Sequence, residues 1–121
     1  MKKIAIYALI ALFISCAGTT NADPASVAEI VAESFYRGKE ATLKKHTTPE
    51  GFATFSNLQK MFAKPKGSES NFKLIDEVTE GDIAWVKYST SYDKTPGIFK
   101  LVKQDDIWKV TVRDPIEKAP F

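Results

Sequence analysis

The hydrophobic pattern changes its period once along the chain, near residue 72. From Asp23 to about residue 64, apolar residues recur every three to four positions, which is typical of amphipathic helices. From Phe72 onward they alternate with polar residues, which is typical of β-strands with one buried face. Helices followed by an antiparallel meander form the α+β pattern. We therefore predict an α+β fold with N-terminal helices packed on a four-stranded antiparallel sheet.

Three helices are predicted in the first half. Asp23-Pro24 supplies an N-cap and a first-turn proline, and Gly38 ends this first helix. A short second helix is expected over 39–46, and a third begins at Pro49 and ends in the loop 64–68. The third helix carries an aromatic stripe, which we interpret as core packing against the sheet. The stripe consists of Phe52, Phe55, Leu58 or Gln59, and Phe62.

Four strands are predicted in the second half, over 72–78, 83–92, 98–103 and 107–113. Gly81 and Asp105-Asp106 lie in the two hairpin loops, and residues 93–97 form a turn cluster. Alternation places one set of side chains toward the helices: Phe72, Leu74, Val78, Ala84, Val86, Tyr88, Trp108, Val110 and Val112.

The opposite face of the predicted sheet mixes lysines with apolar residues. A contiguous second apolar set would mark a surface for a partner. A one-residue error in the assumed register would produce the same appearance, because it exchanges the two faces. The residues of this candidate partner surface are Ile75, Trp85, Ile98, Val102 and Ile107.

The N-terminus has the pattern of an export signal. Met1-Lys2-Lys3 is basic, and residues 4–14 are an uncharged apolar stretch that is too short to span a bilayer. Residues 13–16 resemble a bacterial lipobox that ends at the only cysteine, so by this resemblance Cys16 carries a lipid. We expect a signal peptide over 1–15, a tether over 16–22 and one domain over 23–121. The alternative is cleavage after Ala22, which would release a periplasmic or secreted domain.

Charge and composition exclude several classes of function. The chain has 17 basic and 15 acidic residues, and removal of Lys2 and Lys3 with the leader leaves 15 of each. No positive excess then remains to drive nucleic-acid binding. Nor is there one to attract a membrane surface, so membrane attachment would depend on the acyl chains. Ala17 stands where an aspartate usually retains such lipoproteins at the inner membrane, which favours the outer membrane. One cysteine and one histidine leave no internal disulfide and no His/Cys zinc cluster.

Three segments together resemble a known superfamily. They are FYRGK at 35–39, HTTPE at 46–50 and LVKQDDIWKV at 101–110. Their order is similar to that in small bacterial lipoproteins of the nuclear-transport-factor-2-like (cystatin-like) superfamily, in a group of unknown function with a terminal LVKEDGKWKV hairpin. The resemblance covers residues 23–114 and departs from the group at Asp106-Ile107, where Gly-Lys is commoner. It implies a curved sheet wrapped around the helices as a cone, often with a pocket, and dimers formed sheet to sheet.

The resemblance leaves function open, since this superfamily includes isomerases, dehydratases and binding modules. The sequence contains no nucleophile elbow, phosphate loop or metal-ligand spacing. His46 lies among lysines, which favours a solvated surface position, and Asp114 precedes Pro115 as in a turn. The candidate catalytic groups are His46, Asp114, Tyr36, Tyr88 and Tyr92.

We therefore predict a lipid-anchored binding module without catalytic residues, cofactor or metal. Its binding site would be the back of the sheet, where a homodimer is one expectation, or the pocket of the cone. Tyr36, Tyr88 and Trp108 are the predicted pocket residues. The alternative is a small-molecule-binding or isomerase-like enzyme that uses the same pocket.

Overall fold

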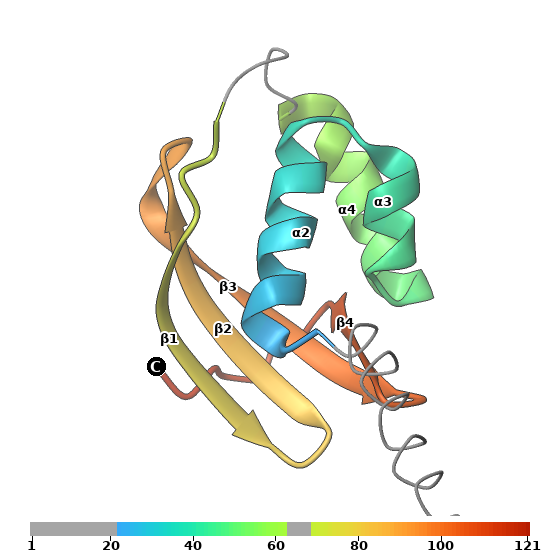
Figure 1. Ribbon diagram of the computed structural model, residues 1–121, viewed down its shortest axis with the longest axis vertical. Helices are drawn as coiled ribbons and strands as arrows, with labels where there is room; N and C mark the ends of the chain where they lie inside the picture. The colour runs from blue at the N-terminus through green and yellow to red at the C-terminus, as the bar shows by residue number, and fades with distance from the viewer. Residues whose placement is uncertain (1–21, 63–68) are drawn as a thin grey trace, which may run out of the picture.

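The change of period near residue 72 marks the boundary between three helices and a sheet. The computed structural model describes residues 22–62 and 69–121, so the predicted signal peptide and Cys16 lie outside the described residues. The helices cover one face of a curved, open sheet (Figure 1). The four strands pair antiparallel in chain order. The elements are α2 (Pro24–Tyr36), α3 (Glu40–Lys45), α4 (Pro49–Phe62), β1 (Lys73–Glu80), β2 (Ile83–Thr90), β3 (Asp93–Gln104) and β4 (Ile107–Thr111).

Both ends of α2 are fixed by side chains. The Asp23 carboxylate accepts a hydrogen bond of 2.8 Å from the Ser26 N–H at the start of the helix, and bonding to Ser26 lowers the pKa of Asp23. At the other end, the buried Gln59 amide donates to the carbonyl oxygens of Ser34 and Phe35 at 2.9 and 3.1 Å. The same two carbonyls also accept from the backbone N–H groups of Lys39 and Gly38, so the Gln59 bonds are additional ones that attach α4 to the end of α2.

The hydrophobic core lies between the helices and the sheet face that they cover. The predicted helix-facing positions Ala84, Val86, Trp108 and Val110 are all buried there, which confirms this part of the alternation. The helices contribute Val27, Ala28, Val31 and Leu43, and β3 adds Leu101. Among residues 22–62 and 69–121, no helix is long and apolar enough to cross a bilayer.

A β-bulge in β1 makes one part of the predicted alternation wrong. Leu74 pairs with Tyr88, but the register then shifts by one residue at Ile75, so Val78 pairs with Trp85 on the back of the sheet. An extra residue in a strand exchanges the faces of everything that follows it. The same shift places Glu77 opposite the buried Val86, where partial burial, followed by the charge of Asp23, raises the pKa of Glu77.

Of the two later turns, the one between β2 and β3 was misplaced by the sequence prediction and the one between β3 and β4 was predicted correctly. The turn between β2 and β3 lies at 91–92, and β3 begins at Asp93, so the predicted turn at 93–97 is wrong. Pro96 has no backbone N–H to donate to a neighbouring strand. It fits inside β3 because it lies between the paired residues Asp93 and Gly97, where the pairing with β2 is irregular. The last turn is confirmed: Asp105 and Asp106 have φ angles of 53° and 63°, the left-handed conformation that a two-residue hairpin loop requires.

The outer edge of β4 is attached to the connection between α3 and α4. The Val110 N–H donates to the His46 carbonyl, and the Thr48 N–H donates to the Val110 carbonyl, both at 3.0 Å. The Thr48 hydroxyl also accepts from the Gly51 N–H at 3.0 Å and donates to the Thr111 hydroxyl at 2.8 Å. These bonds hold the start of α4 against the backbone of β4.

The back of the sheet is partly covered by the chain's own C-terminal segment, which runs behind the sheet from β4 toward β1 (Figure 1). Glu117 accepts two bonds of 2.8 and 2.9 Å from Lys100 Nζ, which lies 5.9 Å from the centre of the Trp85 ring. Lys87 Nζ lies 6.0 Å from the centre of the Phe121 ring. Trp85 is only 6% exposed, so its predicted place on an exposed partner surface is wrong.

Acid should release this C-terminal segment. The hydrogen bond from Lys100 lowers the pKa of Glu117 below its ordinary value of 4.5, so the bond stabilises the segment above that value and is lost as the pH falls through the folded pKa. Between pH 6 and pH 3, the Trp85 indole resonance in NMR spectra should therefore shift with a midpoint below 4.5. Glu117→Gln should remove this transition and exposed Glu80→Gln should retain it. A transition that survives Glu117→Gln would assign the titration to another carboxylate.

Candidate functional site

An apolar pocket of about 140 Å³ lies between α2, α4 and the middle of β2 and β3. Residues of the predicted stripe on α4 form one wall. Among the stripe residues whose side chains the structure describes, Phe55 and Leu58 line the pocket. The lining residues are Val31, Ala32, Phe35, Tyr36, Phe55, Leu58, Tyr88 and Phe99.

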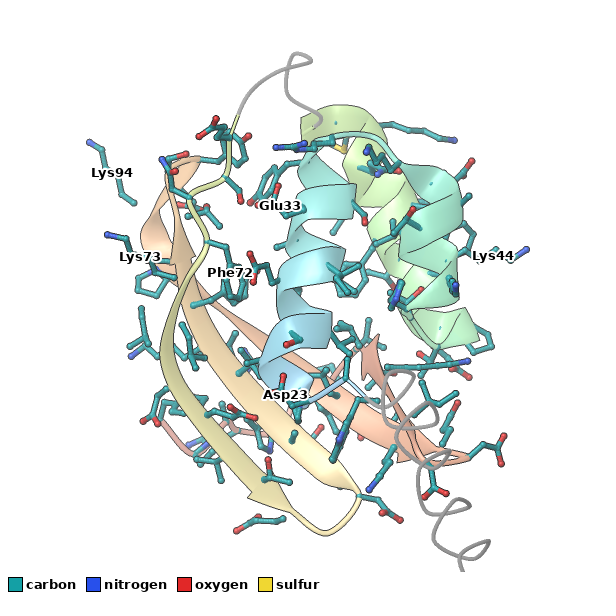
Figure 2. All side chains as sticks on the ribbon, in the orientation of Figure 1. Asp23, Glu33, Lys44, Phe72, Lys73 and Lys94 are labelled. Carbon is teal, nitrogen blue, oxygen red and sulfur yellow. The ribbon has the colours of Figure 1, made fainter. Side chains whose placement is uncertain are left out.

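The walls of the pocket belong to a continuous cluster of aromatic rings. Phe72 stacks on Tyr88 with 5.1 Å between ring centres, and Tyr88 lies 4.8 Å from Phe99. Phe55 meets Phe99 edge to face at 5.8 Å and Phe35 at 6.4 Å. Figure 2 shows Phe72 between β1 and α2, where it closes this side of the cluster. Such ring pairs stabilise packing beyond the area they bury.

A glycine in β3 makes room for the deepest tyrosine. A Cβ atom on Gly97 would lie 2.5 Å from the phenolic oxygen of Tyr88, so only glycine allows the ring to cross β3 at this point. Burial raises the pKa of Tyr88 far above its ordinary value, and burial together with the charge of Asp93 raises that of Tyr36. Both phenols therefore stay protonated at physiological pH and can donate or accept a hydrogen bond.

Leu58 is the one exposed residue of the lining, at 38%, and Tyr36 is partly buried. The rings of Tyr36 and Tyr92 lie 4.6 Å apart beside the pocket. The described lining residues include no carboxylate, imidazole, thiol or amine. Nor do residues 22–62 and 69–121 bring three His, Cys, Asp or Glu side chains together where they could hold a metal ion.

The structure brings together two of the three predicted pocket residues. Tyr36 and Tyr88 line this pocket, whereas Trp108 lies in a separate cleft with Lys103 Nζ 5.6 Å from its ring centre. His46 and Asp114, considered for catalysis, do not line the pocket. Sequence reasoning missed Phe99 and the small or aliphatic lining residues. Phe99 could have been found, because it is two positions before the buried Leu101 on the same strand face.

The remaining residues of the candidate partner surface lie in different settings. Ile75, Ile98 and Ile107 are 48%, 37% and 40% exposed, and Val102 is half-buried. They extend from β1 to β4, with the buried Trp85 between them. The homodimer through this face therefore stays a prediction that now concerns the part of the back left uncovered by the C-terminal segment.

Comparison with known proteins supports the fold assignment. No protein-family model matches the sequence, and no curated protein matches it. A solved structure from Campylobacter jejuni, provisionally described as an NTF2-like transpeptidase, superposes with a TM-score of 0.62. The superposition has 13% sequence identity and covers 76% of this chain and 100% of that chain. At this identity the similarity concerns the fold alone. The chain therefore has the nuclear-transport-factor-2-like fold, as the resemblance predicted.

Proposed function

We propose that the domain is a non-catalytic binding module whose pocket between α2, α4 and the sheet takes a compact apolar group. The observation that carries this proposal is the lining: eight residues, five of them aromatic, around about 140 Å³ without a charged side chain. Apolar cavities of this order stay dry and accept a molecule the size of benzene. The ligand is therefore a single aromatic ring or a short alkyl group, either free or as part of a larger molecule.

The lining also argues for binding over catalysis. An isomerase-like reaction needs a general base within hydrogen-bond reach of the substrate. The two tyrosines are protonated at physiological pH, because the ordinary pKa of a phenol is already near 10 and burial raises it further. Asp93 acts on Tyr36 only through its charge and is itself exposed at the start of β3. The phenols can orient a ligand, but neither can remove its proton at neutral pH.

Filling the pocket should abolish this binding. Ala32 is 1% exposed and lines the pocket, so Ala32→Leu would place a branched side chain in the space of the ligand. NMR titration of the full chain with benzene should give saturable shifts around Tyr88 and Phe99, and Ala32→Leu should weaken binding at least tenfold. Ala53→Leu, on the exposed side of α4, is the matched control and should bind as the wild type does. Equal binding by both variants, or shifts confined to other residues, would overturn the proposal.

We also propose that the domain is exported and lipid-anchored through Cys16 in the bacterial cell envelope, with the outer membrane favoured over the inner. The support is the basic leader, the apolar stretch and the position of the lone cysteine at its end. Residues 16–23 reach about 28 Å when extended, so α2 would begin close to the membrane surface.

Intact mass of the protein extracted from membranes tests the anchor. Wild-type protein should begin at Cys16 and carry the added mass of acyl chains, and Cys16→Ser should lack that mass and leave the membrane fraction. A wild-type mass that begins at Asp23 without modification would show cleavage after Ala22 instead. The lipid anchor would then be wrong, while the pocket proposal would be unaffected.

A further inference from the structure

A second and larger cleft, of about 580 Å³, lies by the start of α2, the end of α3 and the edge strand β4. Its volume is within the range of sites that hold small organic ligands. It shares no lining residue with the pocket of the proposed function. The lining residues are Ala22, Val27, Ile30, Lys45, His46, Ile107, Trp108 and Lys109.

Backbone pairing brings the basic residues of this cleft together. The Val110 N–H donates to the His46 carbonyl at 3.0 Å, and Thr47 forms a bridge with Val110. The end of α3, with Lys45 and His46, is therefore held beside Lys109 on β4. The His46 ring is itself fixed, because its Nδ1–H donates to the Thr42 carbonyl at 2.9 Å. The donors available to an anionic head are therefore the ammonium groups of Lys45 and Lys109.

The cleft combines an apolar wall with positive charge. Val27 and Trp108 are 2% and 8% exposed, and Ile30 and Ile107 extend the apolar wall outward. None of the lining residues is acidic. Three acidic residues are adjacent in sequence to lining residues: Asp23, Glu29 and Asp106. Asp23 accepts a hydrogen bond from Ser26 and, with Asp106 and Lys103, lines a neighbouring hollow that shares Trp108 with the cleft. Glu29 lines another hollow, between α2 and α3. An apolar chain with an anionic end matches this distribution.

We propose that this cleft binds a single-chain amphiphile with a carboxylate head, such as a free fatty acid. The alkyl chain lies along Val27, Ile30 and Trp108, and the head is held by Lys45 and Lys109 at the junction of α3 and β4. Val27 and Trp108 are buried within the fold, so they can contact one chain that enters the cleft but cannot insert into a bilayer. The proposal depends neither on the aromatic pocket nor on acylation of Cys16.

Contact quenching of Trp108 tests the proposal. Trp85→Phe in the full chain leaves Trp108 as the sole tryptophan, and bromine on an alkyl chain quenches indole fluorescence only at contact range. We expect saturable quenching by 12-bromododecanoate below its micellar concentration. The same chain with a trimethylammonium head should bind at least tenfold more weakly. Equal affinity for the two heads would overturn the role of the basic residues.

Charge reversal supplies the matched comparison. Lys45→Glu with Lys109→Glu should weaken binding of the carboxylate at least tenfold. Lys73→Glu with Lys94→Glu changes the net charge equally at two exposed lysines that point away from the body of the domain, and it should change affinity less than twofold (Figure 2). If circular dichroism shows that the first variant is unfolded, the neutral pair Lys45→Gln with Lys109→Gln replaces it and should still weaken binding severalfold.

Two further outcomes would overturn the proposal. Equal loss of affinity in the cleft variant and the control variant would mean that only the net charge attracts the probe. Quenching by phosphatidylglycerol vesicles with brominated acyl chains, without any response to the free carboxylate, would mean that this region meets a membrane surface and holds no single chain.

Discussion

Leu101→Ala should lower the free energy of unfolding by about 3 kcal/mol. Leu101 is 0% exposed and lies in the middle of β3, where its neighbours across the sheet are Ala84 and Val110. Both neighbours are themselves fully buried, so the backbone around them has little freedom to close the space that the leucine leaves. The loss then includes the transfer free energy of the removed atoms and a contribution from the cavity.

Urea unfolding followed by circular dichroism measures this loss. The midpoint should fall while the slope with denaturant stays constant, which indicates a change of stability without a change of the unfolded state. Ile98→Ala is the matched control, because Ile98 lies on the same strand and is 37% exposed. Its cost should stay below about 1 kcal/mol. Equal losses for the two variants would contradict the assignment of the core face of β3.

Gly51→Ala should destabilise the protein by about 2 kcal/mol, although alanine is the better helix former. Gly51 lies in the first turn of α4, where that helix meets β4. A Cβ atom there would lie 2.8 Å from the Val110 carbonyl oxygen and 3.2 Å from Thr111 Cα. Both contacts are with backbone, so no side-chain rotation can relieve them. The substitution would push α4 away from β4 and strain the bonds made by Thr48.

Helix propensity alone would make Gly51→Ala stabilising, so the direction of the change tests the close contact with β4. Asn57→Ala, at an exposed position of the same helix, should be neutral or stabilising by a few tenths of a kcal/mol. Thermal unfolding of both variants gives the comparison. Stabilisation by Gly51→Ala would mean that α4 does not approach β4 as closely as described.

Local chemistry explains why much of the fold could be predicted. The start of α2 needed only Asp23-Pro24, and the β3–β4 turn needed two residues that tolerate a positive φ. The change of hydrophobic period separated helices from strands for the same reason, since it reflects which face of each element is buried. Two residues of the pocket, Tyr36 at the end of α2 and Tyr88 on the helix-facing side of β2, were predicted.

The errors share a different cause, which is contact between distant parts of the chain. The exposure of Trp85 depends on a C-terminal segment about 30 residues away, whose position is set by the bonds between Lys100 and Glu117. Which side chains of β1 face the helices depends on a bulge at Ile75, and no turn residue in the sequence indicates that bulge. Trp108 faces the helices, as predicted, but it does not line the predicted pocket. It lines another cleft, which the end of α3 forms with β4.

The packing of α2 against β4 sets the order in which the chain can fold. Val27 and Val31 are buried in one core with Trp108 and Val110, which are synthesised about 80 residues later. Contacts of such sequence separation slow folding, since a long loop must close before they form. A nascent chain that ends before β4 leaves the apolar face of α2 without its partner. The core therefore cannot be completed until the final hairpin has been synthesised.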